Sequence, residues 1–426
     1  MDVQLHGARP DRRAAGGGAG GGAGHRLRVC HVITKLELGG AQQNTLYTVR
    51  HLDRRRFDPS LIAGPGGVLD EEARRIVGVT FETSPPLRRE IRPLDDARAL
   101  IDLTRRLKRL APHIVHTHSS KAGILGRAAA FFARVPVIVH TVHGWGFHDG
   151  LPRTRRALYV LAEQMAQLLT TRTVAVSEAN VRTGVSRDIA PPEAFRVIRS
   201  GVELERFRRS TGSGRLREEL RVPEGAPLVG MVACLKPQKA PLDFVAVAAR
   251  VAQAHPTARF VLAGDGELRP EVERAVAAAG LAGRFFLLGW RRDPEIVVGD
   301  LDVLVLTSRH EGLPRVIPEA MSAGKPVVAT AVDGSPEAVL PGRTGFLRPP
   351  GDVEGIAADV SRLLRDPALA RRFGRAARLH VRPWDIDEMV RAQERLYLEL
   401  AREARLPTPA VAAPDQRTVA SPVASS

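Results

Sequence analysis

The chain has 426 residues and a mass of 46.2 kDa, whereas single domains usually run to about 100–200 residues. Two domains are therefore expected. A content of 44% hydrophobic and 26% charged residues is typical of folded globular chains and excludes a disordered tail protein or a collagen.

The chain is basic, with a formal net charge of +16. Its basic residues are 57 arginines and only 6 lysines, a skew that indicates arginine-favouring usage rather than a designed polyphosphate-binding face. Aromatic residues make up 4% of the chain and do not alternate with basic ones, which argues against nucleic acid as a partner. We expect the positive net charge to attract the protein weakly to an anionic membrane surface.

Cysteine usage and hydropathy indicate a cytoplasmic protein. Cys30 and Cys234 cannot build a disulfide framework and have no neighbours at metal-ligand spacing. No apolar run reaches the length of about 18 residues that a membrane span requires, and the first residues, MDVQLHGARPDRR, lack the apolar core of a signal peptide. We expect a protein that is neither secreted by that route nor integral, with peripheral contact at the inner face of the plasma membrane.

In chain order, residues 1–24 end in a glycine-rich tract and are expected to form a disordered tail. Short β-rich apolar runs then alternate with segments of helical periodicity, such as 95–110 and 241–254. The predicted strands of the first half are 26–34, 60–64, 113–118, 135–141 and 173–177, and those of the second half are 227–235, 258–264, 284–289, 301–308 and 325–330.

A polar stretch with glycines separates the two series and predicts a hinge over 200–225. The predicted domains are 25–205 and 206–383. A helix over 384–405 is expected to pack back on the first domain, and residues 406–426 are expected to be a second disordered tail. This alternation predicts two doubly wound α/β domains of Rossmann type that face a central cleft, a geometry that suits a phosphorylated ligand.

The segment HEGLPRVIPEAMSAGKPVVAT (310–330) is the most informative. A proline is tolerated in the first turn of a helix, so a helix is predicted to begin near Pro314. The free N–H groups of Leu313 and Arg315 are then expected to face the cleft, where a diphosphate would bind. Glu319 is placed to accept hydrogen bonds from a vicinal diol and Glu311 from a second hydroxyl group. The pattern alone leaves open that both glutamates are solvated surface charges.

Glu311 and Glu319 form an E-x7-E signature, and the segment resembles family 4 of the retaining, nucleotide-sugar-dependent glycosyltransferases, which have two Rossmann-like domains (the GT-B fold). The resemblance covers about residues 26–400 and is strongest to enzymes of exopolysaccharide and capsule type. It is supported in order by GGAQQNTL (39–46), HTHSSKAGILGR (116–127), HTVHGWGF (140–147), VAVSEAN (174–180), VIRSGVELERF (197–207), LKPQKAP (235–241), LAGDGEL (262–268) and GRTGFL (342–347).

The resemblance implies a catalytic group of three residues. Glu311 would lie beside the donor sugar and Lys239 would neutralise the donor diphosphate. His143 would touch the sugar from the first domain, opposite the other two, with Gly144 and Gly146 leaving room for the sugar ring. The alternative for His143 is a structural histidine that holds its loop, and the alternative for Lys239 is an exposed lysine at a helix start.

The resemblance also implies the donor nucleotide site. Glu319 would hold the ribose hydroxyls, and the backbone near Gly312 and Leu313 would meet the phosphates. Much of the family has an arginine where this chain has Cys234, so either Lys236 supplies the charge or Lys239 and the helix amides suffice. The remaining donor-side candidates are Gly39, Gly40, Trp290 and Arg291.

Histidines are dense in the first domain, but their spacing matches no zinc site. His116 and His118 end a predicted strand beside the cleft and Ser119 and Lys121 follow in the loop, so these four are candidates for contact with the acceptor. A structural hydrogen-bond network of the histidines is an equal alternative. We expect no metal ligand, no divalent cation and no other cofactor.

The expected function is retaining transfer of a hexose-type unit from a nucleoside diphosphate sugar, UDP-linked, to a glycan or lipid-linked acceptor in cell-surface polysaccharide synthesis. The alternatives are another enzyme of the same fold, such as a nucleotide-sugar epimerase or a phosphorylase, and a non-catalytic sugar-nucleotide sensor. The sequence encodes no particular donor sugar or acceptor.

Overall fold

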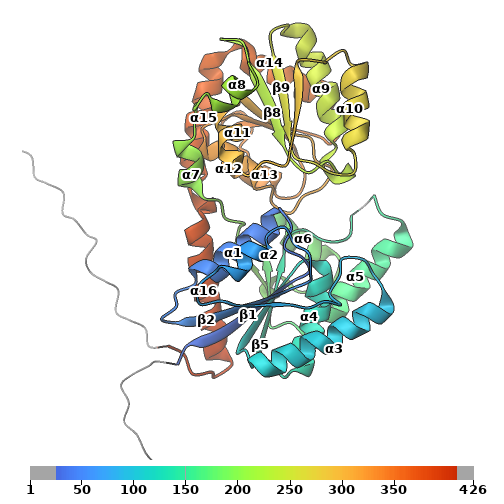
Figure 1. Cartoon of the computed structure of the whole chain (residues 1–426), viewed down its shortest axis with the longest axis vertical. Helices are drawn as coiled ribbons and strands as arrows, with labels where there is room; N and C mark the ends of the chain where they lie inside the picture. The colour runs from blue at the N-terminus through green and yellow to red at the C-terminus, as the bar shows by residue number, and fades with distance from the viewer. Residues whose placement is uncertain (1–24, 149, 410–426) are drawn as a thin grey trace, which may run out of the picture.

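The computed structural model describes residues 25–148 and 150–409 and shows two α/β domains arranged end to end (Figure 1). The predicted tails over 1–24 and 410–426 lie outside the described residues. Each domain contains one parallel sheet, and the two sheets confirm the predicted pair of Rossmann-like domains.

The first domain has a seven-stranded sheet in the order β3-β2-β1-β4-β5-β6-β7. The strands are β1 (Leu27–Ile33), β2 (Phe57–Ala63), β3 (Thr80–Thr83), β4 (Ile114–His118), β5 (Val137–Val142), β6 (Arg172–Ala175) and β7 (Phe195–Val197). The helices are α1 (Gly40–His51), α2 (Asp70–Arg74), α3 (Pro93–Leu110), α4 (Ser120–Phe132), α5 (Arg153–Gln167), α6 (Glu178–Ser186) and the 3-10 turn η1 (Pro192–Ala194).

The second domain has a six-stranded sheet in the order β10-β9-β8-β11-β12-β13. The strands are β8 (Leu228–Val232), β9 (Arg259–Ala263), β10 (Phe285–Gly289), β11 (Val303–Leu306), β12 (Val327–Thr330) and β13 (Gly345–Arg348). The helices are η2 (Pro237–Lys239), α9 (Pro241–Ala254), α10 (Arg269–Ala278), α11 (Pro294–Asp300), α12 (Val316–Ser322), α13 (Ser335–Ala338), α14 (Val353–Arg365) and α15 (Pro367–His380).

The inner strands form because most of their residues are apolar and both of their faces are covered by helices. Every residue of β4, β5, β11 and β12 is buried. In β4 this burial includes His116 and His118, which lie two residues apart and so share one face of the sheet. The register places His116 beside His31 of β1 and His118 beside Thr141 of β5. Polar rings are therefore held inside the first domain, at the carboxyl end of its central strands.

The polar stretch predicted as a hinge is partly helical. It contains α7 (Leu204–Arg209) and α8 (Arg215–Glu219), whose side chains Leu204, Phe207 and Leu216 are buried in the core of the second domain. The three side chains are apolar and belong to one buried cluster, so the free energy gained by their burial outweighs the polar character of their neighbours.

The chain returns to the first domain after α15. The turn η3 (Arg382–Trp384) leads into α16 (Ile386–Glu403), whose apolar face packs with Leu27, Val29 and Phe57 in one hydrophobic cluster. Figure 1 shows α16 running from the second domain down the side of the first, next to α1. The last helix of the described residues therefore completes the core of the first domain.

None of the helices within residues 25–148 and 150–409 is long and apolar enough to cross a membrane.

Candidate active site

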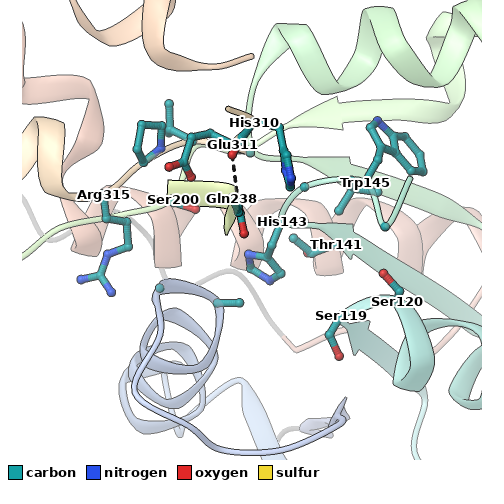
Figure 2. A pocket seen from close by; sticks show the side chains of 18 of the residues that line it. Ser119, Ser120, Thr141, His143, Trp145, Ser200, Gln238, His310, Glu311 and Arg315 are labelled. Atoms are coloured by element: carbon teal, nitrogen blue, oxygen red, sulfur yellow. Dashed lines mark hydrogen bonds between the residues drawn. The ribbon is translucent and has the colours of Figure 1, made fainter. Parts of the chain in front are cut away.

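A cavity of about 490 Å³ lies between the two domains, at the carboxyl ends of both sheets (Figure 2). The first domain contributes the start of α1, the loop before α4 and the loop after β5, and the second contributes η2 and the loop before α12. Among the predicted site residues, the cavity is lined by Gly40, Ser119, His143, Lys239, Glu311, Gly312 and Leu313. The fold thus brings together residues up to 273 positions apart in the chain, from Gly40 to Leu313.

Glu311 and Lys239 form a close ion pair in the wall of the cavity. Lys239 Nζ donates to Glu311 Oε1 at 2.5 Å, and Ser308 Oγ donates to the same oxygen at 2.6 Å. The amide of Glu311 donates to Asp333 Oδ2 at 2.5 Å, and burial raises the pKa of Asp333 above its usual range. The carboxylate of Glu311 is therefore held in place, with a cation beside it that a diphosphate could share.

The loop after Glu311 contains the predicted free amides. The helix α12 begins at Val316, two residues after the predicted start at Pro314. Within the described residues, the N–H groups of Gly312, Leu313 and Arg315 have no hydrogen-bond acceptor. Such N–H groups beside a lysine form a site that attracts phosphate oxygens.

The two domains touch where Gly312 meets the loop after β5. A Cβ on Gly312 would lie 1.9 Å from the carbonyl oxygen of His143, and a Cβ on Gly144 would lie 3.3 Å from the amide nitrogen of Gly312. Gly144 also has a φ of 144°, which side chains rarely adopt. A Cβ on Gly146 would lie 2.8 Å from Ser120 Oγ. A Cβ at Gly144 or Gly146 would therefore meet protein atoms, while both glycines line the cavity, and the expectation that they leave room for a sugar ring stays a prediction.

Glu319 lies one turn into α12, where it is buried and does not line the cavity. Its carboxylate is 3.7 Å from the guanidinium of Arg315, which also donates to Gln43 Oε1 of the first domain at 2.5 Å. Burial raises the pKa of Glu319, and the charge of Arg315 opposes this shift. The side chain of Arg315 lines the cavity and joins the two domains, whereas only its backbone N–H group was expected at the site.

His143 reaches the cavity from the first domain, as Figure 2 shows. Its Nε2 lies 3.1 Å from His118 Nδ1, whereas its Nδ1 makes no hydrogen bond within the described residues. Burial lowers the pKa of His143 to about 4, so the ring is neutral at neutral pH. His143 therefore presents one ring nitrogen to the cavity and keeps the other bonded inside the domain.

His116 and His118 do not line this cavity, in contrast to their expected place beside an acceptor. His116 is bonded to Tyr397 and Thr141, and His118 is bonded to His31 and His143. Both rings face the interior because they lie on a strand that is buried on both sides. The geometry matches the alternative that the sequence left open, a structural network.

Two further acceptor-side candidates have different surroundings. Ser119 lines the cavity and its hydroxyl lies 2.7 Å from Thr34 Oγ1. Lys121 pairs with Asp96 at 2.5 Å and donates to the carbonyl of Glu90, so α3 and the loop before it hold this lysine away from the cavity.

The remaining donor-side candidates do not line the cavity. Gly39 precedes α1, Lys236 precedes η2, and Trp290 follows β10 with 53% of its surface exposed. Arg291 is bonded to the carboxylates of Glu219 and Asp293, at 2.6–3.0 Å and 2.9 Å. Cys234 is partly exposed, because it lies beyond β8, which ends at Val232.

Several residues that line the cavity were not predicted as site residues, although they belong to motifs that support the family resemblance. Gln238 directly precedes Lys239, and its Nε2 donates to the carbonyl of His310 at 2.9 Å. Thr141 lies near the end of β5 and Ser200 follows β7, and both belong to recognised segments. A position at or just after the end of a parallel strand indicates that a residue lies near the cleft. Whether its side chain points into the cavity depends on the tertiary structure.

Two Rossmann-like sheets that face each other across a cavity, with a lysine, a glutamate and free loop amides in its wall, define the GT-B class of glycosyltransferases. Residues 38–206 match the family described as Glycosyltransferase Family 4, and residues 213–380 match the family described as Glycosyl transferases group 1.

Three relatives illustrate the similarity. The chain is 34% identical over 348 residues to the UDP-Gal:alpha-D-GlcNAc-diphosphoundecaprenol alpha-1,3-galactosyltransferase of Escherichia coli, across 81% of this chain and 89% of that one. It is 28% identical to the GDP-mannose-dependent alpha-mannosyltransferase of Mycobacterium tuberculosis, across 83% and 92%. The crystal structure of Anabaena HepE in complex with UDP-glucose has a TM-score of 0.76 at 22% identity, across 87% and 100%.

The chain belongs to the family 4 glycosyltransferases, and its activity is that of a transferase.

Proposed function

We propose that the protein is a retaining hexosyltransferase that moves a sugar from a UDP-linked donor to a lipid-linked or glycan acceptor in cell-surface polysaccharide synthesis. The observation that carries this proposal is the cavity wall, in which Lys239, Glu311 and free loop amides face His143 of the other domain. The similarity to a galactosyltransferase whose name includes UDP-Gal and a diphosphoundecaprenol acceptor supports the choice of donor and acceptor classes.

Lys239 and the amides of Gly312 and Leu313 would bind the donor diphosphate. In this proposal they stabilise the negative charge that develops on the leaving group, so no divalent cation is needed. Glu311 already accepts hydrogen bonds from Lys239 and Ser308, which suits a fixed partner for the sugar better than a free nucleophile.

The proposed chemistry is attack on one face of the sugar. The bond between the anomeric carbon and the phosphate oxygen breaks while the acceptor oxygen bonds to that carbon from the same side. The acceptor proton moves to the departing phosphate oxygen, which leaves as the nucleoside diphosphate, and the configuration is retained.

The donor is tested by a thermal-shift series with UDP, GDP, UDP-galactose and GDP-mannose. A ligand at 100 times its Kd adds about 2.7 kcal/mol of stability. We expect UDP and UDP-galactose to raise the Tm, followed by transfer from UDP-galactose to GlcNAc-diphosphoundecaprenol. A response to GDP compounds alone would overturn the UDP assignment, and donor binding without transfer or hydrolysis would favour a sensor.

Glu319→Gln is expected to weaken UDP binding by roughly 1–3 kcal/mol, because hydrogen bonds between the carboxylate and the ribose hydroxyls would be lost. Isothermal titration with UDP measures this change, and the Tm without ligand checks that the buried site stays folded. Glu354→Gln, at an exposed glutamate of α14, is the matched control. Unchanged UDP affinity in the Glu319 variant would remove it from the ribose site.

We also propose that the first domain contacts an anionic membrane surface through α4 and α5, which pack together (Figure 1). Apolar side chains on these helices are more than half exposed, namely Phe131, Phe132, Leu158, Leu161 and Met165. The one acidic residue of α5 is Glu163, and it is buried against Arg127 at 2.5 Å. A basic helix with outward apolar side chains is suited to a headgroup surface.

The paired change Leu161→Glu and Met165→Glu is expected to weaken binding to phosphatidylglycerol vesicles at least about tenfold, because exposed apolar area no longer enters the bilayer. Co-sedimentation at low and high salt measures this binding. Leu379→Glu, on α15 of the second domain and 70% exposed before the change, is the control. Wild-type protein that stays in the supernatant at low salt would contradict the membrane proposal.

A further inference from the structure

A chain of buried polar rings connects the cavity to α16. It begins at His143 in the cavity wall, passes through His118 of β4 and His31 of β1, and ends at Tyr397 of α16. His31, His118 and Tyr397 are almost completely buried. No residue of α16 lines the cavity, so the chain is a polar path between two separated parts of the fold.

The links are short enough to order the rings. His143 Nε2 lies 3.1 Å from His118 Nδ1, and His118 Nε2 lies 2.9 Å from His31 Nδ1. His31 Nε2 lies 3.4 Å from the hydroxyl of Tyr397, which is the longest link. The same hydroxyl lies 2.5 Å from His116 Nδ1, and His116 Nε2 lies 2.6 Å from Thr141 Oγ1.

The hydrogen bonds between these rings make the position of the proton on each histidine depend on its position on the next. A neutral imidazole has one N–H and one acceptor nitrogen, so each histidine that donates at one end must accept at the other. Burial lowers the pKa of His31 to about 3 and the pKa of His118 well below its usual range, which keeps both rings neutral. His143, His118 and His31 must then share one tautomer, either all Nε2–H or all Nδ1–H.

The hydroxyl of Tyr397 determines which of the two shared tautomers the histidines adopt. This hydroxyl lies 2.5 Å from His116 Nδ1 and 3.3 Å from Gln393 Oε1, and when it donates to either of these its oxygen is left to accept from His31 Nε2–H. That arrangement makes all three histidines Nε2–H tautomers and leaves His143 Nδ1 as an acceptor in the cavity.

We propose that Tyr397 is a positioning residue for the transferase reaction, which acts through His31 and His118 to set the tautomer that His143 presents to the donor sugar. The inference rests on the proposed role of His143 beside that sugar. The catalytic site is then complete only when α16 is docked on the first domain.

A metal ion is the competing use of this cluster, since ring nitrogens of His31, His116 and His118 lie within 4.8 Å of one another. However, His31 and His118 are inclined by only 7° and their facing nitrogens are 2.9 Å apart. Two ligands of a tetrahedral zinc at its usual bond lengths would be about 3.3 Å apart, with both lone pairs aimed at the ion. The geometry is that of a hydrogen bond between nearly parallel rings.

The test compares Tyr397→Phe with Tyr47→Phe. Both changes remove one hydroxyl at the contact between α16 and the first domain, but Tyr47 bonds to Asp387 at 2.7 Å and does not touch the histidine chain. In Tyr397→Phe, His31 faces the positive edge of a phenyl ring, where a lone pair is preferred to an N–H. The donor and acceptor of each hydrogen bond between the three histidines should then exchange roles, and His143 should become an Nδ1–H tautomer.

The readout is imidazole ¹⁵N NMR on the full chain, with signals assigned by single His→Gln variants. We expect one shared Nε2–H tautomer for His143, His118 and His31 in the wild type and in Tyr47→Phe, and the opposite tautomer at His143 in Tyr397→Phe. Three results would each overturn the proposal that Tyr397 sets the tautomer of His143. They are mixed tautomers in the wild type, an unchanged tautomer of His143 in Tyr397→Phe, and zinc retained in equimolar amount after purification.

Turnover is measured in parallel, as transfer from UDP-galactose to GlcNAc-diphosphoundecaprenol. We expect Tyr397→Phe to lower kcat about tenfold, with KM for UDP-galactose and the affinity for UDP nearly unchanged and Tyr47→Phe close to the wild type. The NMR measurement of the tautomer needs no substrate. A wild type without transfer activity would therefore contradict the proposed function, and the effect of Tyr397 on the tautomer of His143 would still be decided by NMR. A kcat equal to the wild type despite a reversed tautomer would overturn the positioning role.

Discussion

His143→Ala is expected to reduce sugar transfer by 10²-fold or more, an effect of roughly 3 kcal/mol on the barrier, while affinity for sugar-free UDP stays nearly unchanged. The reason is the position of the ring. His143 lies in the cavity wall on the first domain, whereas Lys239 and the loop before α12 belong to the second. Kinetics of transfer and titration with UDP, both on folded variant, measure the two quantities.

The two ring nitrogens of His143 can be separated by amide substitutions. His143→Asn places an amide near the Nδ1 position in the cavity and loses the bond to His118, whereas His143→Gln places an amide near Nε2 and keeps that bond. If Nδ1 serves the sugar, the asparagine variant should retain more transfer activity than the glutamine variant. A lower Tm with transfer and UDP affinity falling together would instead indicate a structural histidine.

Lys239→Met is the second change with a large expected effect. It removes the cation from the wall of the cavity, and loss of one preorganised charge partner for a leaving group costs about 10²–10³-fold in kcat. UDP affinity should fall as well, because the lysine would bind the diphosphate in the ground state. Glu311 would lose its ion pair, so the Tm is measured to confirm that the variant remains folded.

Lys236→Met is the matched control for Lys239, since it removes a lysine three residues earlier that does not line the cavity. We expect its kcat and UDP affinity to stay within a few fold of the wild type. An equal loss in both variants would mean that Lys236 supplies the charge missing at Cys234, and a loss in Lys236→Met alone would contradict the assignment of Lys239.

The inner strands were predictable because each is a short buried run bounded by turn residues and rich in β-branched side chains, and the predicted runs 113–118 and 301–308 contain β4 and β11. The edge strands β3, β7 and β13 were not predicted as strands. They have three or four residues with mixed polarity, and an edge position needs no continuous apolar pattern. Helices with strong periodicity, such as α9, were located to the residue.

The site was predictable where chemistry follows a strand end. Lys239, Glu311 and His143 are far apart in the chain, but each comes shortly after a strand, and the carboxyl ends of parallel strands share one edge of a sheet. That rule, together with the family resemblance, was sufficient to expect them around one cleft. The same rule also suggested His116 and His118, which the structure places in the interior.

The sequence by itself therefore determined the two sheets, the family and the loops that carry the cavity residues, since apolar periodicity and local motifs are properties of neighbouring residues. Only the tertiary structure decided which way each side chain points. Gly312 and Gly144 are required by the contact between the two domains, and Arg315 reaches Gln43 across it. The pairing of His31 with Tyr397, 366 positions apart, depends on α16 docking on the first sheet, which no local pattern encodes.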